Sequence, residues 1–551
     1  MNDLNYIEKA EELYLKKNYY SSLNILNSLL TNNFSYFLLK AKNYFELKEY
    51  YLALKNSQEA INLNPDNLES YQILTKCYIL MFDFEKAEKC LKKCNLLDSS
   101  SKINLEIKNI LNNKIKEINA NKKNNKHYED YINFMKYLYS QGLFLNKITI
   151  NFNNESNRSV ISTEEIKNKD ILLRIPLNAL ITLDDAQNSE IGKYFDSELK
   201  KTLNGPNHSL LSSFILYEME KKNKSKWLFY FNFLPANYNS FPIFYTETEL
   251  KYLKGTQFLT IIQNKKKEMK EDYETLCNKI PYYSKYNFKD FCKVREIVSS
   301  RIFGVIIHGK KNDIIAPYAD MLNHKRPRET HWAFDDKLDS FVVSAISDIN
   351  KSNEVFDSYG RKCNSRFLLN YGFTIENNED NEYKINLVLD ETCPLFQEKK
   401  KDFIILNPKK FNLSKNLNEK NVQNFFAFMR YLVYEKNDFK FMNFNNFISI
   451  NNERSVMVKL KYIIINELNN YPTSLEEDQK YLNENKKKMS FNEYNCYIIR
   501  IGEKNLLNFY LTLANECLEL FNKEMNEINN IINSQKKSLI PYNGYLTELL
   551  K

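Results

Sequence analysis

The sequence predicts an α+β protein of several domains: an N-terminal array of helical repeats, a β-rich domain with a helical insertion, and a helical C-terminal domain. Three observations predict this architecture. No glycine precedes Gly142, a 34-residue period is visible before residue 100, and short β-rich runs begin after Tyr128. The chain has 551 residues, of which 43% are hydrophobic. Several cores can therefore form at roughly 100–200 residues per domain.

The N-terminal stretch is expected to be helical because tight hairpins usually need glycine. Five positions recur 34 residues later: Phe37, Ala41, Tyr44, Ala53 and Ala60 are followed by Tyr71, Thr75, Tyr78, Ala87 and Cys94. This pattern resembles tetratricopeptide repeats, in which small residues let paired helices approach and aromatic residues fill the gaps between pairs. We expect the array over residues 1–118, with a capping helix at 101–118 and a linker at 119–128.

Two roles for the array stay open at this point. Such arrays usually present a concave groove that binds a peptide, so a peptide partner is one expectation. The alternative is that the array only packs against the rest of the chain. The sequence alone does not separate these two interpretations.

Composition excludes several classes of protein. The net charge of +9 is spread over 551 residues, too thinly to predict direct binding of nucleic acid. No run of 18 apolar residues occurs, so we expect no membrane span.

The nine cysteines are scattered without a CxxC pair, which favours reduced thiols and no metal site. We expect a monomer in the cytoplasm, with the nucleus as the alternative location.

The central region lacks several common catalytic motifs. Neither GxGxxG, GxxxxGK[ST], HExxH nor GxSxG is present. This removes the motif support for dinucleotide-binding, P-loop, zincin and hydrolase interpretations.

One ordered pair of sequence motifs remains. The segment Pro317-Tyr-Ala-Asp320-Met-Leu-Asn323-His324 is followed, 35 residues after its end, by Tyr359-Gly-Arg-Lys-Cys-Asn-Ser-Arg-Phe-Leu-Leu-Asn-Tyr371-Gly-Phe373. This resembles the SET-domain methyltransferases, in the branch of Rubisco large-subunit methyltransferase and actin-histidine methyltransferase. Further landmarks of that branch are IKNKDILLRIP at 166–176, Leu234-Pro235 and Ser300-Arg301-x-Phe303.

The resemblance implies a division of the remaining chain. We expect a SET domain at 129–390, a helical insertion at about 186–290, and a substrate-binding-like helical domain at 391–551. The chain departs from the family at a glycine-rich turn near the start of the domain, where it has Ser156-Asn157-Arg158-Ser159-Val160.

The resemblance also implies roles for particular residues. Tyr359 matches the catalytic tyrosine. Asn323 and His324 match residues that bind the cofactor, S-adenosylmethionine, and Asn157 and Arg158 match the turn that contacts it. Five further residues match or accompany positions that contact the substrate or frame its channel: Arg301, Asp320, Tyr371, Phe373 and Trp332. Arg301 has a second interpretation, as a structural ion-pair partner of Asp320.

The expected reaction is methyl transfer to a protein side-chain nitrogen, with lysine favoured. A lysine amine has a pKa near 10.4, so its neutral form costs about 4.6 kcal/mol at pH 7 in water. An aromatic channel lowers that pKa by desolvation. Histidine is the alternative acceptor, because imidazole is already largely neutral at pH 7. A second class of function is a non-catalytic adaptor, which the replaced glycines favour and which Asn323, His324 and Tyr359 disfavour.

Overall fold

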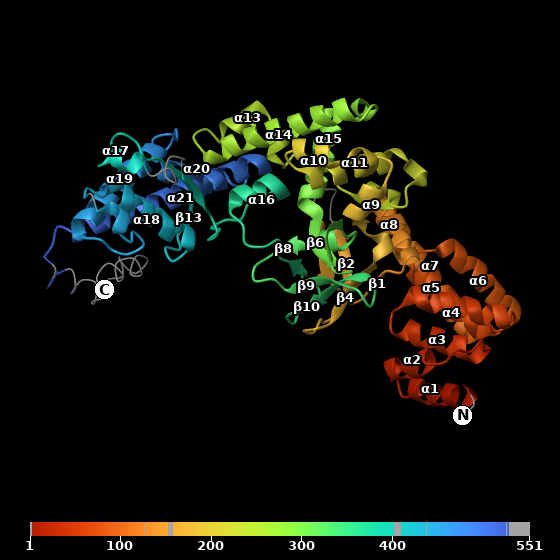
Figure 1. Ribbon diagram of the computed structural model, residues 1–551. Coiled ribbons are helices and arrows are strands. Elements are labelled where there is room, and N and C mark those ends of the chain that lie inside the picture. Colours follow the sequence, from red (N-terminus) through yellow and green to blue (C-terminus); the bar gives the residue numbers. More distant parts are fainter. Residues whose placement is uncertain are drawn as a thin grey trace. The chain divides into compact units, whose positions relative to one another are not determined.

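The computed structural model describes residues 3–125, 127–152, 158–401, 409–436, 438–524, 526–527 and 530. It confirms the expected class: a helical N-terminal region, a domain of short strands, and a mainly helical C-terminal region (Figure 1). Two compact units are present: residues 1–237 with 272–359, and residues 238–271 with 360–551. Among the described residues, no helix is both long and apolar enough to cross a bilayer.

The N-terminal array consists of paired helices stacked in chain order (Figure 1). Its helices are α1 (Asp3–Leu15), α2 (Tyr19–Asn27), α3 (Phe34–Glu46), α4 (Tyr50–Leu63), α5 (Leu68–Leu80), α6 (Phe84–Leu97) and α7 (Lys102–Asn124). The repeated small residues explain the pairing, since Ala41, Ala53, Ala60 and Ala87 have no exposed surface. The expected linker is shorter than 119–128, because residues 119–124 continue α7.

The array packs against the β-rich part of its own unit through the turns inside the second and third helix pairs. At one turn, Glu49 forms an ion pair with Arg174. At the other, the Phe82 ring lies 6.1 Å from the Tyr131 ring, centroid to centroid, and Asp83 accepts an ion pair from Lys136 at 3.0 Å. Tyr131 and Lys136 belong to α8 (Tyr128–Gln141). Packing against the rest of the chain is therefore a property of this array.

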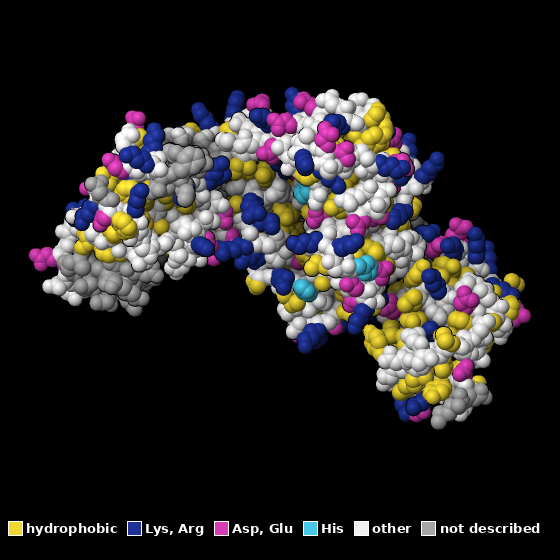
Figure 2. All heavy atoms as spheres, viewed as in Figure 1, with side chains coloured by type: hydrophobic (Ala, Val, Ile, Leu, Met, Phe, Trp, Pro, Cys, Tyr) yellow, Lys and Arg dark blue, Asp and Glu magenta, His cyan; other side chains and the backbone are white. Residues whose placement is uncertain are grey.

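Hydrophobic side chains also remain at the surface of the array. Figure 2 shows them over the part that Figure 1 labels α1 to α4. Leu15 is 74% exposed, Tyr20 is 71% exposed and Leu30 is fully exposed. A peptide partner for the array stays a prediction.

The β-rich domain is built from small, mostly antiparallel sheets. Strands β1 (Phe144–Leu145), β4 (Ile171–Pro176), β10 (Ser340–Ala345) and β9 (Thr330–Asp335) form one sheet in that order. Strands β5 (Ile181–Thr182), β7 (Lys310–Ile315) and β6 (Ile302–Ile307) form a second. Strand β2 (Ile148–Phe152) pairs with β3 (Arg158–Ser162). The parallel pair β8 (Asn323–His324) and β11 (Phe356–Asp357) aligns Asn323 with Phe356.

Between β5 and β6 the described chain contains no strand. Its α-helices are α9 (Leu183–Asn188), α10 (Ser197–Thr202), α11 (Pro206–Glu220), α12 (Leu228–Phe233), α13 (Glu247–Lys251), α14 (Gln257–Lys279) and α15 (Phe288–Arg301), of which α13 and the first part of α14 belong to the second unit. In the first unit, buried Asp272 anchors this region. Its carboxylate accepts hydrogen bonds from Ser209 and Arg295.

The C-terminal segment of the second unit begins at residue 360, earlier in the chain than residue 391. Besides α13 and the first part of α14, which lie in residues 238–271, its elements are α16 (Asn364–Tyr371), β12 (Tyr383–Leu387), α17 (Phe396–Lys400), β13 (Lys409–Leu413), α18 (Lys420–Val433), α19 (Ile450–Leu468), α20 (Leu475–Asn485) and α21 (Phe491–Leu520). Residues 360–390, expected with the SET domain, pack here because β12 pairs with β13 and α16 contacts α21. The core of this unit includes Phe425, Met429, Val456 and Leu513, all fully buried.

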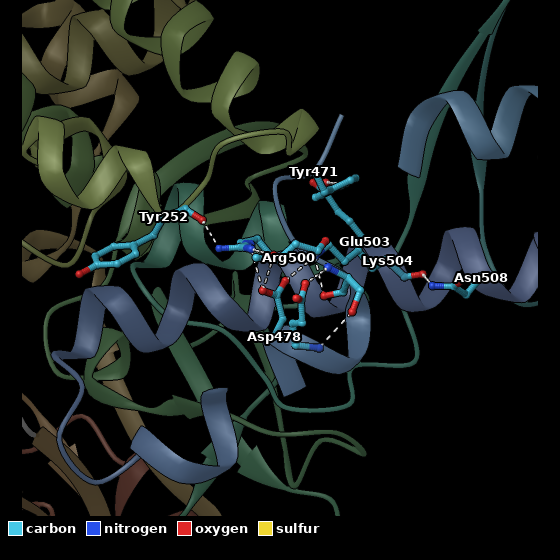
Figure 3. Close-up of polar contacts among 10 residues, drawn as sticks. Tyr252, Tyr471, Asp478, Arg500, Glu503, Lys504 and Asn508 are labelled. Atoms are coloured by element: carbon cyan, nitrogen blue, oxygen red, sulfur yellow. Dashed lines mark hydrogen bonds and ion pairs between the residues drawn. The ribbon is translucent and has the colours of Figure 1, made fainter. Parts of the chain in front are cut away.

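Buried charges hold α20 and α21 together (Figure 3). The Asp478 carboxylate receives Arg500 at 2.6 Å and Lys504 at 2.5 Å, and all three side chains are at most 5% exposed. Glu503, which directly precedes Lys504 on α21, accepts a hydrogen bond from the Tyr471 hydroxyl at 2.5 Å and from the backbone N–H groups of Gln257 and Phe258 at the start of α14. Burial raises the pKa of the Glu503 carboxyl to about 7.

This carboxyl predicts a pH-dependent stability. Because the pKa of Glu503 rises from 4.5 to about 7 on folding, its contribution is complete below pH 4.5 and is lost as pH rises through 7. The loss amounts to about 3 kcal/mol. In Glu503→Gln the melting temperature should therefore fall less between pH 5 and pH 8 than in the wild type. Melting curves at several pH values measure this, and parallel pH profiles for the two proteins would contradict it.

Candidate active site

The segment that precedes β8 has a strained backbone. Tyr318 has φ +86° and ψ −50°, and its side chain is fully buried. A bulky residue with this conformation needs support from its surroundings, at a cost of order 1–3 kcal/mol. A short 3₁₀ turn, Ala319–Met321, follows, and only Leu322 separates it from Asn323. The strain therefore lies beside the residues that the sequence singled out.

Arg301 and Asp320 form a buried ion pair. The Arg301 Nη1 lies 2.8 Å from Asp320 Oδ2, and the Tyr230 hydroxyl donates to the same oxygen at 2.7 Å. The side chain of Asp320 is fully buried and that of Arg301 is 13% exposed. This geometry agrees with the second interpretation of Arg301, as a structural ion-pair partner of Asp320. A substrate contact for the two residues stays a prediction.

Asn323 ties three segments of the first unit together. Its Nδ2 donates to the backbone carbonyl of Arg158 at 3.0 Å and to Glu354 Oε1 at 2.7 Å. Arg158 is the first residue of β3, and Glu354 pairs with Ile161 of the same strand through an isolated bridge. The side-chain amide therefore holds the start of β3 in place. Sequence reasoning missed Glu354, because no motif marks it.

Arg158 lies over an aromatic ring of the insertion. Its guanidinium carbon is 4.3 Å from the centroid of the Phe233 ring, and its Nη1 donates to the Phe233 carbonyl oxygen. Phe233 in turn stacks on Phe134 of α8, with ring centroids 4.9 Å apart. Phe233 is a second residue that the sequence analysis missed. Asn157, the other residue expected in this turn, lies outside the described residues.

Tyr359 is fixed by the segment that contains Asn323. Its backbone N–H donates to Nδ1 of His324 at 2.9 Å, and its hydroxyl donates to the carbonyl oxygen of Leu322 at 2.8 Å. The two rings are stacked, with centroids 5.2 Å apart. Because Nδ1 accepts a hydrogen bond, it carries no proton in this arrangement. The parallel pairing of β8 and β11 thus brings together two motifs that are 35 residues apart.

Trp332 belongs to an aromatic cluster on the large sheet of the first unit. Its ring lies 5.2 Å from Phe303 and 5.8 Å from Phe341, between centroids. Its Nε1–H donates to Asp357 Oδ2 at 3.1 Å. Burial raises the pKa of the Asp357 carboxyl. The cluster supplies aromatic surface, and the role of Trp332 as a channel wall stays a prediction.

Tyr371 and Phe373 lie in the second unit, on either side of Gly372. This glycine ends α16 with φ +77°, and a Cβ at its position would lie 2.6 Å from the Ser240 hydroxyl oxygen. Only glycine fits both the backbone conformation and the close approach. The structure therefore brings Arg158, Arg301, Asp320, Asn323, His324, Trp332 and Tyr359 into the first unit, and Tyr371 and Phe373 into the second.

Comparisons with known proteins match three segments of the chain. Residues 157–360 match the SET domain, residues 390–507 match the family described as Rubisco LSMT substrate-binding, and residues 10–124 match ChAPs (Chs5p-Arf1p-binding proteins). The actin-histidine N-methyltransferase of Rhinolophus ferrumequinum is 23% identical over 427 residues, covering 72% of this chain and 71% of that protein. The human protein of the same name is 24% identical over 284 residues, 49% of this chain and 47% of that protein.

Solved structures of Rubisco LSMT share the fold. The structure bound to AdoMet has a TM-score of 0.59 at 21% identity, covering 71% of this chain and 93% of that one. The SET domain of LSMT bound to lysine and AdoHcy has a TM-score of 0.58 at 20% identity, covering 75% and 95%. SET domains of this kind are found in protein methyltransferases that use S-adenosylmethionine. The chain therefore contains a SET domain at residues 157–360 and a substrate-binding domain of the Rubisco LSMT type at residues 390–507, and it is similar to the actin-histidine N-methyltransferases.

Proposed function

We propose that the protein is an S-adenosylmethionine-dependent protein methyltransferase and that its acceptor is a lysine side chain. The observation that carries this proposal is one connected set of contacts. Leu322, Asn323 and His324 are consecutive, and between them they bind the Tyr359 hydroxyl, the start of β3 and the Tyr359 backbone. The expected catalytic residue is thus held by the segment that contains Asn323 and His324, two of the expected cofactor residues.

The described residues fit the cofactor chemically. S-adenosylmethionine presents an adenine edge, an amino group and a carboxylate. Asn323 offers a carboxamide, its neighbour Glu354 offers a carboxylate, and Arg158 offers a guanidinium close by. Arg158 would face the cofactor's carboxylate, Glu354 its amino group, and Asn323 with His324 the adenine edge. Charge-assisted hydrogen bonds of this kind are the stronger ones in proteins.

When bound, the cofactor supplies a methyl group on a sulfonium, whose C–S bond breaks as the amine nitrogen forms the new C–N bond. The chain has to deliver the amine neutral and in line. Aromatic surface near the amine lowers its pKa by desolvation, and the proton leaves to solvent before transfer. The Tyr359 hydroxyl donates to the Leu322 carbonyl. A phenolic oxygen can also accept a hydrogen bond, and in the proposed reaction it would accept one from the amine.

Histidine is the second candidate acceptor. It is supported by the relatives, which are named actin-histidine N-methyltransferases. Imidazole needs little deprotonation at pH 7, so an enzyme for histidine gains less from a desolvating channel and more from hydrogen bonds that orient the ring. The rate of methyl transfer should rise with pH well above pH 7 for a lysine acceptor and level off near pH 7 for histidine.

The contacts of Asn323 predict a loss of cofactor affinity in Asn323→Ala. The change removes the clamp on Arg158 and leaves Glu354 without its partner. A lost hydrogen bond typically costs about 0.5–1.5 kcal/mol, so the Kd should rise about two- to twelvefold. Calorimetry with S-adenosylmethionine measures this. Asn168→Ala, a change at an exposed asparagine of the same unit, is the matched control. Equal affinity of Asn323→Ala and wild type would show that the pocket lies elsewhere.

Tyr359→Phe tests the catalytic assignment. The ring that stacks on His324 stays, so the cofactor should bind with unchanged affinity. The lost hydroxyl should lower kcat and kcat/KM together, by ten- to a thousandfold, because it acts mainly in the transition state. Steady-state methyl transfer is the measurement, with Tyr371→Phe as the comparison. Full activity of Tyr359→Phe would refute the assignment, and a larger loss in Tyr371→Phe would mean that the two tyrosines have exchanged roles.

A further inference from the structure

The second unit contains a cavity of about 890 Å³. It is lined by α20, by α21, by Arg361, by Asn364 at the start of α16 and by residues 376–381 and 415–416. This volume lies within the range of about 300–1,000 Å³ that is usual for ligand pockets. All of its lining residues belong to the second unit.

The walls of this cavity are held in place by buried polar contacts. Asp478 of α20 binds Arg500 and Lys504 of α21, as Figure 3 shows, and this fixes the two helices against one another. Asn364 holds another part of the lining, residues 376–381, in place. Its side chain bonds the backbone N–H and carbonyl of Ile375 and receives Asn378 Nδ2. The cavity is therefore preformed rather than assembled by a ligand.

The lining is rich in carboxamides. Eight of its nineteen residues are Asn or Gln. Within the described part of the chain, the side chains of Gln479, Asn483 and Asn505 make no hydrogen bond, in contrast to Asn364 and Asn378 on the other wall. These three side chains come from the two helices that Asp478 joins. Each offers a free donor and a free acceptor to a ligand.

The charges of the lining cancel. Three basic residues face three acidic ones, and two of the basic residues are already paired: Arg361 with Asp380 at 2.6 Å, and Lys486 with Glu376. The floor is apolar, with Leu482, Ile498 and Leu506 buried. A neutral lining of this kind does not select a polyanion such as nucleic acid. It suits a neutral ligand with alternating donors and acceptors, which is the chemistry of a peptide main chain.

The spacing on α20 agrees with this ligand. Gln479 and Asn483 are four residues apart, so they lie about 6 Å apart along the helix axis. In an extended peptide, main-chain groups that face the same side recur every two residues, at about 6.8 Å. Two carboxamides on one helix can therefore bond successive same-side groups of one extended strand.

We propose that this cavity binds an extended, uncharged segment of polypeptide through its main chain. The segment belongs to the protein substrate, and only this identification of its source rests on the proposed function. Recognition of the main chain leaves the side chains of the segment largely free. The cavity would then hold substrate at a position distinct from the residue that is modified.

The test measures binding without cofactor, so that it is independent of methyl transfer. The probe is fluorescein-labelled acetyl-(Ser-Gln)₅-amide, titrated with the full-length protein and followed by anisotropy. Saturable binding is expected, with a Kd raised about tenfold in Gln479→Ala/Asn483→Ala, both exposed positions. The control is Lys480→Ala/Glu484→Ala, one position further along α20 at each site and outside the lining, which should bind like wild type.

A second probe is the same peptide with every other main-chain nitrogen methylated, which should bind at least tenfold more weakly. Equal binding of the methylated peptide, equal affinity of the Gln479→Ala/Asn483→Ala variant and wild type, or no binding of the peptide to wild type would each overturn the inference. Tighter binding of decathymidylate than of the peptide would show that the ligand class is wrong. If the peptide binds as expected but no protein is methylated, the binding of polypeptide by the cavity is supported and the proposed methyltransferase activity is refuted.

Discussion

The hydrogen bond from the Tyr359 backbone to His324 Nδ1 is the interaction on which the arrangement of the site depends. It joins two motifs that are 35 residues apart and places the tyrosine ring against the imidazole. The Tyr359 hydroxyl reaches the Leu322 carbonyl from the same position. One short strand, β8, therefore sets the position of the tyrosine and, through Asn323, of the start of β3.

This arrangement has a cost that its surroundings offset. Tyr318 has a backbone conformation that bulky residues rarely adopt, and Asp320 is a buried carboxylate. A buried charge is stable only when paired and hydrogen-bonded. Arg301 and Tyr230 supply that pairing, from α15 and α12. We infer that the helical insertion contributes to the site by supporting the segment before β8, in addition to any contact it makes with substrate.

The sequence predicted the parts that have a periodic or ordered signal. The 34-residue period predicted the helical array, and the motif at 317–324 predicted the segment that holds Tyr359. Residues whose role depends on a single long-range contact could not be predicted from the sequence. Glu354 and Phe233 have no motif of their own, and their importance follows only from Asn323 and Arg158 in three dimensions. The packing of residues 360–390 in the second unit could not be predicted either, because β12 pairs with a strand that lies beyond residue 400.

The central claim is that the protein transfers methyl groups to a protein side chain. The most direct test incubates the purified full-length protein with S-adenosylmethionine carrying a labelled methyl group and a cell extract, followed by mass spectrometry of the labelled peptides. Label is expected in methyllysine, at a level that exceeds incubation without the protein. Label in methylhistidine would support methyl transfer by this protein with histidine, instead of lysine, as the acceptor. No label above that background, from protein that binds the cofactor, would show that the protein is not a methyltransferase for proteins of this extract.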